Sequence, residues 1–202
     1  MTTTTSAEVA KRDDSAAARV AQYRESFTAV LPSHIKPDTW VRVAQGALKK
    51  GPRAKNGQGT QLEVAAKNNV GAFLSSLLDA ARLGLEPGTE QYYLTPRWNG
   101  KTKQEEILGI VGWQGYVELM YRAGAISSVV AECVYEHDRF SFSPGRDDIP
   151  HHDIDWDADD RGKLRLVYAF ARMKDGATSR VVVLNRAAIE RIKASSQGAD
   201  SD

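Results

Sequence analysis

Basic and aromatic side chains stand next to one another at several places in this sequence. Arg97 adjoins Trp98, and Arg122 directly follows Tyr121. A lysine or arginine neutralises phosphates, and an aromatic ring stacks on any base without reading its edge. The pattern predicts a site for single-stranded nucleic acid with these candidate contacts: Arg97, Trp98, Lys101, Lys103, Gln114, Tyr121, Arg122, Arg139, Arg172, Lys174, Arg180, Arg191 and Lys193.

Two of these candidates are expected to stack on bases, and most of the others are expected to contact the phosphate backbone. Trp98 and Tyr121 supply the rings, with Gln114 as a polar neighbour. Structural roles compete with these, because Trp98 could cap a hydrophobic edge, and Phe140 and Phe142 suit a core. No dedicated readout helix stands out, so we expect binding that does not depend on base sequence.

The charge is balanced overall but unevenly distributed along the chain. The formal net charge is +1. Residues 36–67 nevertheless hold seven basic residues against two acidic ones, and residues 161–193 hold nine against two. Such basic blocks are compatible with a polyanionic partner, although solvated protein faces are also commonly charged. A third reading is an oligomeric scaffold, in which the seven aspartates between Asp147 and Asp160 dock on the 161–193 block of a neighbouring copy.

The acidic stretch 151–160 is the best candidate for a metal site, but it lacks the two diagnostic residues of a calcium loop. Counted from Asp153, position six is Ala158 where glycine is needed, and position twelve is Leu164 where glutamate is needed. Magnesium could still associate without a specific site, and a metal-dependent nuclease stays open as an alternative function. We expect no required cofactor.

Other enzyme classes lack their signatures. The chain has no phosphate-binding loop and no motif of a serine hydrolase or a zinc protease, so ATP-driven chemistry is not expected. Cys133 is the single cysteine, which excludes a disulfide framework and a multi-cysteine zinc site and suits a reducing cytoplasm. Its apolar neighbours predict an inert core position.

Length and composition indicate a globular protein. The chain has 202 residues, of which 42% are hydrophobic and 26% charged. These values favour one domain over 17–197, with a flexible tail over 1–16 and a short tail over 198–202. The N-terminus does not resemble a secretory signal, and no apolar run approaches the ~18 residues of a membrane helix, so we expect a cytoplasmic location and no membrane partner.

Hydrophobic periodicity and turn residues predict a mixed fold. We expect helices over 17–30, 38–50, 70–83, 113–123 and 186–193, and strands over 91–98, 107–111, 126–135, 140–142, 164–173 and 181–184. Asn69 and Asn185 are suited to cap helices, and Gly84 to end one. Because strands adjoin strands without regular βαβ alternation, the order indicates an α+β fold with a small, mostly antiparallel sheet, β-hairpins and flanking helices.

Several local features make these predictions specific. Asn99-Gly100 and Asp175-Gly176 are two-residue turn signals, while 51–59 and 143–160 are predicted loops. The helix over 113–123 is expected to bury one face and to expose Gln114 and Tyr121 on the other. The residues of the expected buried face are Trp113, Tyr116, Val117, Met120 and Ala123.

Six stretches, taken together and in order, resemble the RecT family of phage single-strand annealing proteins. They are residues 83–88 (LGLEPG), 93–96 (YLTP), 109–116 (GIVGWQGY) with 122–124 (RAG), 138–142 (DRFSF), 168–176 (YAFARMKDG) and 192–197 (IKASSQ). No single stretch is specific, and the order and spacing over about 30–197 carry the resemblance.

The resemblance implies ATP-independent binding of single-stranded DNA, assembly into rings or helical filaments, and annealing of complementary strands through a duplex intermediate. It also implies a phage exonuclease as partner and a Rad52-like annealing core. Chains of this family usually continue into further helices, whereas this sequence stops at Asp202. The resemblance therefore also implies a chain shortened at its C-terminus.

Overall fold

The computed structural model describes residues 15–55, 57 and 59–196. Its contacts divide the chain into two compact units, Met1–Leu119 (unit 1) and Met120–Asp202 (unit 2). The sequence predicted one domain over 17–197, and whether the two units work as one domain stays a prediction. The predicted tails lie mostly outside the described residues, but Ala16 is buried in the first helix, so the packed chain begins before residue 17.

Five helices build most of unit 1: α1 (Ala16–Gln22), α2 (Arg24–Thr28), α3 (Pro37–Ala47), α4 (Gln61–Asn68) and α5 (Val70–Leu83). The helix expected over 17–30 is two helices that meet at Tyr23. Their core surrounds Trp40, whose indole N–H donates to the Leu85 carbonyl and whose ring lies 5.2 Å from Phe27. The large buried side chains thus come from helices far apart in the sequence.

The helix α4 was not predicted from the sequence. Thr60 and Glu63 form a capping box at its start, in which each side chain bonds the other residue's backbone N–H. The next helix, α5, follows almost at once, with Asn69 as its N-cap and Gly84 as its left-handed C-cap. Both of these expected caps of α5 are confirmed.

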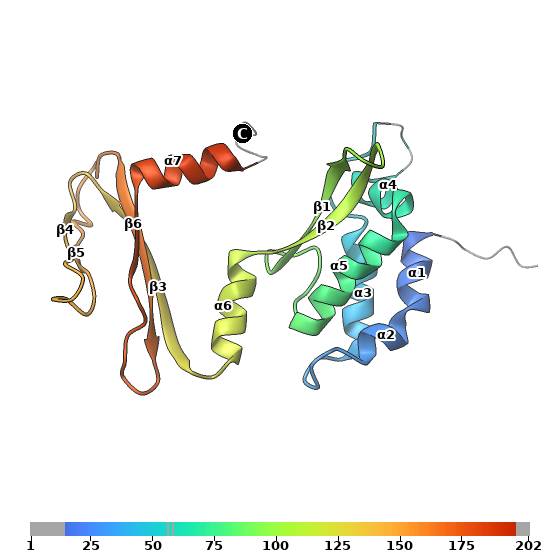
Figure 1. The fold of residues 1–202 in the computed structure, drawn as a ribbon, viewed down its shortest axis with the longest axis horizontal. Helices are drawn as coiled ribbons and strands as arrows, with labels where there is room; N and C mark the ends of the chain where they lie inside the picture. Colours follow the sequence, from blue (N-terminus) through green and yellow to red (C-terminus); the bar gives the residue numbers. More distant parts are fainter. Residues whose placement is uncertain (1–14, 56, 58, 197–202) are drawn as a thin grey trace, which may run out of the picture. The chain divides into compact units, whose positions relative to one another are not determined.

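A β-hairpin packs on α4 and α5 (Figure 1). It consists of β1 (Tyr92–Asn99) and β2 (Gln104–Val111), and its inner face buries Tyr92, Leu94 and Ile107 in the helical core. The backbone N–H of Gly109 donates to Ser76 Oγ on α5, so this edge of β2 is covered by the helix. Pro96 lies in the middle of β1.

The turn of this hairpin differs from the prediction. Asn99 pairs with Gln104, which leaves a four-residue loop rather than a two-residue Asn-Gly turn. The Asn99 side chain accepts hydrogen bonds from the N–H groups of Lys101 and Thr102, and Lys103 takes a positive φ of 56°. Asparagine stabilises the turn through its side chain instead of through its own left-handed backbone.

The helix α6 (Trp113–Arg122) exposes two aromatic residues of the face that was predicted to be buried, while Tyr121 is exposed as predicted. Trp113 is 70% exposed and Tyr116 is 59% exposed, whereas Gly115 is the buried residue. A Cβ on Gly112 or Gly115 would overlap the carbonyl oxygen of Glu90 or Gln91. The glycine side of α6 therefore fits against backbone, which turns the aromatic side outward.

Unit 2 contains a three-stranded antiparallel sheet in the order β3 (Ile126–Tyr135), β6 (Leu164–Met173), β7 (Val182–Asn185). Its second, two-stranded sheet pairs β4 (Arg139–Ser141) with β5 (His151–Asp153), a strand missed within the predicted acidic loop. Val134, Tyr168 and Phe170 form the core on one face of the larger sheet. The strand predicted over 164–173 is confirmed, and it is the central strand of this sheet.

The last helix, α7 (Arg186–Ser195), begins directly after β7, with the Asn185 side chain accepting from the N–H of Ala188. The fold class is therefore α+β with antiparallel pairing, as predicted, although the strands form separate small sheets rather than one. In the part of the chain that the structure describes, no helix has the length and hydropathy needed to cross a membrane.

Candidate nucleic-acid interface

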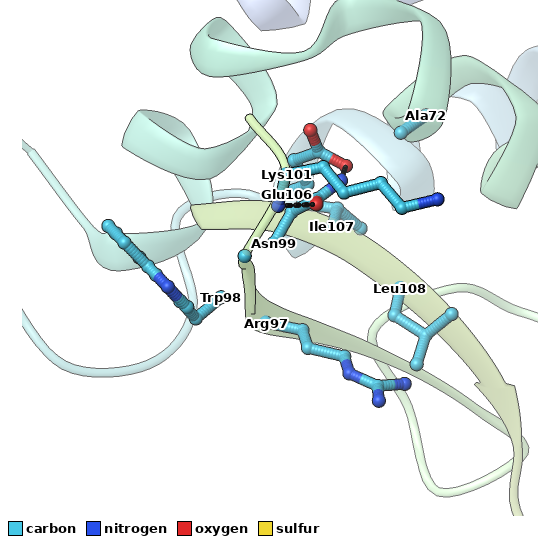
Figure 2. A pocket seen from close by; sticks show the side chains of 9 residues that line it. Ala72, Arg97, Trp98, Asn99, Lys101, Glu106, Ile107 and Leu108 are labelled. Carbon is cyan, nitrogen blue, oxygen red and sulfur yellow. Dashed lines mark hydrogen bonds between the residues drawn. The ribbon is translucent and has the colours of Figure 1, made fainter. Parts of the chain in front are cut away.

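The loop end of the first hairpin brings four predicted contacts close together in the chain. Arg97 and Trp98 lie near the end of β1, and Lys101 and Lys103 lie in the loop; we call these four residues the hairpin tip. Arg97, Trp98 and Lys101 line an open pocket of about 620 Å³, together with Ala72 of α5 and Leu108 of β2 (Figure 2). Trp98 is 60% exposed, as a base-stacking ring must be.

The two side chains at the end of β1 extend in opposite directions. Figure 2 shows Arg97 on the side of Leu108 and the Trp98 indole on the other side of the hairpin. This follows from strand geometry, in which successive side chains alternate between faces. A strand of DNA at the tip could contact the cation and the ring on two different sides.

Acidic side chains reduce the positive field at the tip. Glu106 lies directly across from Arg97 in the register, and Glu105 lies across from Trp98. Hydrogen bonds from the side chains of Asn99 and Thr102, at 2.9 and 2.8 Å, hold the pKa of Glu106 below its ordinary value. Glu106 therefore stays ionised, and it shapes the loop at some electrostatic cost to anion binding.

A second group of candidates gathers in unit 2, where β6 turns toward β7. Arg172 and Lys174 precede the predicted Asp175-Gly176 turn, and Arg180 follows it. The Lys174 N–H donates to the Ala125 carbonyl, so the C-terminal end of α6 lies beside this turn. We call the following set the turn surface: Tyr121, Arg122, Arg172, Lys174 and Arg180.

Tyr121 has a structural contact within the turn surface. Its hydroxyl accepts a hydrogen bond of 3.3 Å from the N–H of Val129 on β3, while its side chain stays 43% exposed. The hydrogen bond fixes the direction of the ring, which leaves one part of it open to solvent. A structural role and the predicted stacking role of Tyr121 are therefore both compatible with its position.

The remaining predicted residues belong to neither of these two groups. Gln114 donates to Glu90 at 2.8 Å, and its own side-chain oxygen is buried without a partner. Arg139 begins β4, beyond the end of β3 that is farthest from the turn surface, and ten residues of strand span about 30 Å. Arg191 and Lys193 are exposed on α7.

Sequence reasoning missed several exposed apolar residues. On the outer face of the hairpin, Tyr93 pairs with Ile110, and the two side chains are 43% and 45% exposed. Trp113 and Tyr116 were placed in the core, but both are exposed on α6. The two glycines at 112 and 115 are the signal that could have found them, because positions three apart share one side of a helix and glycine allows a neighbouring backbone to approach closely.

A buried ionic network supports β4 and β5. The Asp138 side chain, only 1% exposed, accepts from Arg161 at 2.6 and 3.0 Å, from the N–H of Tyr135 at 2.8 Å, and bonds His152 at 3.1 Å. The hydrogen bonds from Arg161, followed by those from Tyr135 and His152, hold the pKa of Asp138 well below its usual range. This network fixes the strand that carries Arg139.

Metal and cysteine chemistry find little support in the described residues. Within them, no group of three or more histidine, cysteine or acidic side chains is arranged to hold a metal ion. Cys133 is exposed, so the predicted core position is wrong. It lies on the face of the sheet opposite the Val134 core, because side chains alternate along β3.

Comparison with known proteins decides the family. The model of the RecT family matches residues 52–201, which include both the hairpin tip and the turn surface. The chain belongs to the RecT family. It is 31% identical over 182 residues to Protein RecT of Escherichia coli strain K12, covering 88% of this chain and 62% of that protein. The family resemblance expected from the motifs is thus confirmed, and the chain spans less than two thirds of this RecT relative.

Proposed function

We propose that this chain binds single-stranded DNA and anneals complementary strands in phage homologous recombination, without ATP and as a ring or helical filament on DNA. The observation that carries the proposal is the exposed combination of cations and an indole at the hairpin tip of a RecT-family chain. The proposal includes an annealed duplex intermediate, a phage exonuclease that exposes the strand, a cytoplasmic location and a Rad52-like core.

Annealing needs two strands to test their register while their mutual repulsion is reduced. Lysine and arginine side chains would neutralise the backbone of the first strand, and rings such as Trp98 would hold bases without reading them. The bases stay available, so pairing supplies the specificity and the protein supplies charge and geometry. A row of copies along the strand would extend this surface. The side chains of the two surfaces require no nucleotide cofactor for such a role.

Annealing itself is the direct test. Two complementary oligonucleotides, one carrying a fluorophore and the other a quencher, are mixed with the chain in buffer without nucleoside triphosphate. We expect pairing to be faster than in buffer alone, with no change on adding ATP. A parallel incubation of labelled DNA with magnesium tests the nuclease alternative, because shortened products would identify a nuclease. Binding without faster pairing would contradict the proposal and favour a scaffold.

Removing charges from the hairpin tip or from the turn surface should change how the affinity for single-stranded DNA depends on salt. For single strands, each lost phosphate contact lowers the slope of log affinity against log salt by about 0.7. Replacing Arg97 and Lys101 with Ala, or Arg172 and Arg180 with Ala, should each reduce this slope by about 1.4, for every DNA sequence alike. Fluorescence anisotropy between 50 and 300 mM salt (about the range in which such contacts weaken) measures it.

The matched control removes the same charge elsewhere. Lys36 and Lys55 are both exposed in unit 1 and belong to neither surface, so replacing them with Ala should change the slope little. An equal loss in all three double variants would show a diffuse electrostatic attraction instead of two binding surfaces. A loss confined to one DNA sequence would indicate base readout, against the proposal.

A further inference from the structure

The three-stranded sheet of unit 2 has an apolar face opposite its core. Val134, Tyr168 and Phe170 pack on the core face, and the alternate residues of the same strands point the other way. A hollow of about 260 Å³ lies on that second face, and strand residues line it. Those that supply its apolar surface are Ala131, Cys133, Val167, Ala169, Val182 and Leu184.

The side chains around this hollow are small and accessible. Ala131 and Cys133 are exposed, and Val182 is 52% exposed. Small residues on a sheet leave space for the side chains of an approaching helix, and an accessible apolar face of this kind is typical of an interaction site. The hollow therefore fits an apolar stripe about one helix wide.

The helix α7 of the same unit carries such a stripe. At 3.6 residues per turn, Ala188, Ile189 and Ile192 share one side of the helix, and Ala194 lies on the opposite side. None of the residues of α7 is buried, and Ile192 is 57% exposed. Ala188 and Ile189 are half-buried where α7 contacts β6 and β7, so the open part of the stripe is at Ile192. The spacing of the stripe is that of a helix that docks in a groove.

The charges beside the hollow and on α7 are opposite. Arg161 reaches the carbonyl of Cys133 at 3.4 Å and lies 6.0 Å from the ring of Trp156, which is 81% exposed. The aspartates at 155, 157 and 159 alternate through the same segment and are exposed. On α7, Arg191 and Lys193 flank the apolar stripe. This acidic segment lies at the β3 edge near the backbone of Cys133, and its charge complements that of a cationic helix.

We infer that the hollow of one copy receives the α7 helix of a second copy, with Ile189 and Ile192 on the strands and Arg191 and Lys193 toward the acidic segment at 155–159. The inference rests on the proposed function, because it supplies a contact surface for the assembly of the annealing protein on DNA.

A contact between two different surfaces repeats from copy to copy, and it builds a ring or an open filament rather than a closed dimer. Ten helical residues are about 15 Å long, and a contact of that size buries less than the ~1,600 Å² of a standard interface. We therefore expect weak association of free chains and stronger association when single-stranded DNA aligns them.

Cross-linking tests the contact, because Cys133 is the single cysteine and lies in the hollow. Ile192→Cys places a second thiol on the stripe, and Ala194→Cys places one on the opposite side of α7 as the matched control. Each variant of the 202-residue chain is treated with a short bis-maleimide, with and without a single-stranded oligonucleotide. We expect a ladder of covalent dimers and higher species at least fivefold stronger for the position-192 variant, and stronger still with the oligonucleotide.

Mixing identifies the direction of the contact. An Ile192→Cys chain that also carries Cys133→Ser is combined with the unmodified chain, and the inference predicts only the heterodimer between positions 192 and 133. Equal yields from positions 192 and 194 would overturn the inference. So would a link formed within one chain, which would place α7 in its own hollow. Far-ultraviolet circular dichroism confirms that the variants fold.

Annealing is measured on the same preparations, so the two proposals can fail separately. Annealing without the specific cross-link would overturn the α7 contact and leave the proposed function in place. The specific cross-link without annealing would support the contact and contradict the proposed function. Ile192→Asp provides a second test, since it should weaken the assembly of chains on the oligonucleotide as measured by light scattering, whereas Ala194→Asp should not.

Discussion

Replacing Asp138 with Ala should destabilise unit 2 by about 3–5 kcal/mol, the range observed when one partner of a buried ion pair is removed. The substitution leaves Arg161, His152 and the Tyr135 N–H without their shared acceptor. Hydrogen exchange followed by mass spectrometry should show faster exchange in β4, β5 and β6. Peptides from α5 in unit 1 provide an internal reference and should be unaffected.

The pH dependence of this effect has a defined sign. Because the pKa of Asp138 in the folded chain is well below the ordinary value of about 3.9, the unfolded chain takes up the proton first as the pH falls. The stabilisation is therefore complete above about pH 5 and is lost progressively below about pH 4. The difference in unfolding free energy between the original chain and the Asp138→Ala variant should therefore shrink as the pH falls below about 4.

Asp157→Ala is the matched control, because Asp157 is an exposed aspartate in the same acidic segment. We expect its effect on stability to stay within about 0.5 kcal/mol, as for most surface substitutions. If the two variants lost protection equally, the ionic network would not be what holds β4 and β5 in place.

The second large effect is expected at Gly115. An Ala there would overlap the carbonyl oxygen of Gln91 and come within 3.0 Å of Val111. Since backbone cannot move away as a flexible side chain can, the helix must shift, and overpacking of this kind costs about 1–3 kcal/mol. Urea unfolding followed by the fluorescence of buried Trp40 should detect the loss in unit 1.

Gly46→Ala separates this steric effect from helix propensity. Gly46 lies inside α3, and a Cβ there would have no neighbour within 4 Å. Ala is favoured over Gly in a helix by about 0.5–1 kcal/mol, so this variant should be slightly more stable than the original chain. Stabilisation by both substitutions would show that α6 does not pack closely on the turn at residues 90–91.

Features set by short-range chemistry were predicted well. The caps at Asn69, Gly84 and Asn185 and the turn at Asp175-Gly176 depend on side-chain hydrogen bonds or on glycine within a few residues. The strand over 164–173 was likewise predicted because it is apolar on both sides. These signals need no knowledge of the rest of the fold.

The failures come from packing between distant segments. The apolar face of α6 was read from its side chains, but the helix approaches its neighbour through glycines that contribute no hydrophobic signal. The helix α4 is short, and its capping box follows a glycine-rich loop that masked it. Asp138 and Arg161 are 23 residues apart, so their pairing needed the β4–β5 sheet to be known first.

The candidate site shows the same division between local and distant information. Arg97, Trp98 and Lys101 were correctly expected together because one hairpin carries them. The association of Tyr121 with Arg172 and Lys174 depends on how α6 leads into β3, which no local pattern reports. Whether these residues contact DNA stays a prediction.

Pro96 has a consequence for how copies of this chain can meet. In an antiparallel pair, the backbone groups of a residue point either toward the partner strand or away from it, in alternation. The N–H of Gly109 points away from β1 to Ser76, and Ile107, two residues earlier, has the same orientation. Pro96 pairs with Ile107, so its nitrogen faces the edge of β1 that is not paired with β2. Proline has no hydrogen to donate there, and an incoming strand would find the ladder broken at its midpoint. The hairpin is thereby protected against amyloid-like strand addition.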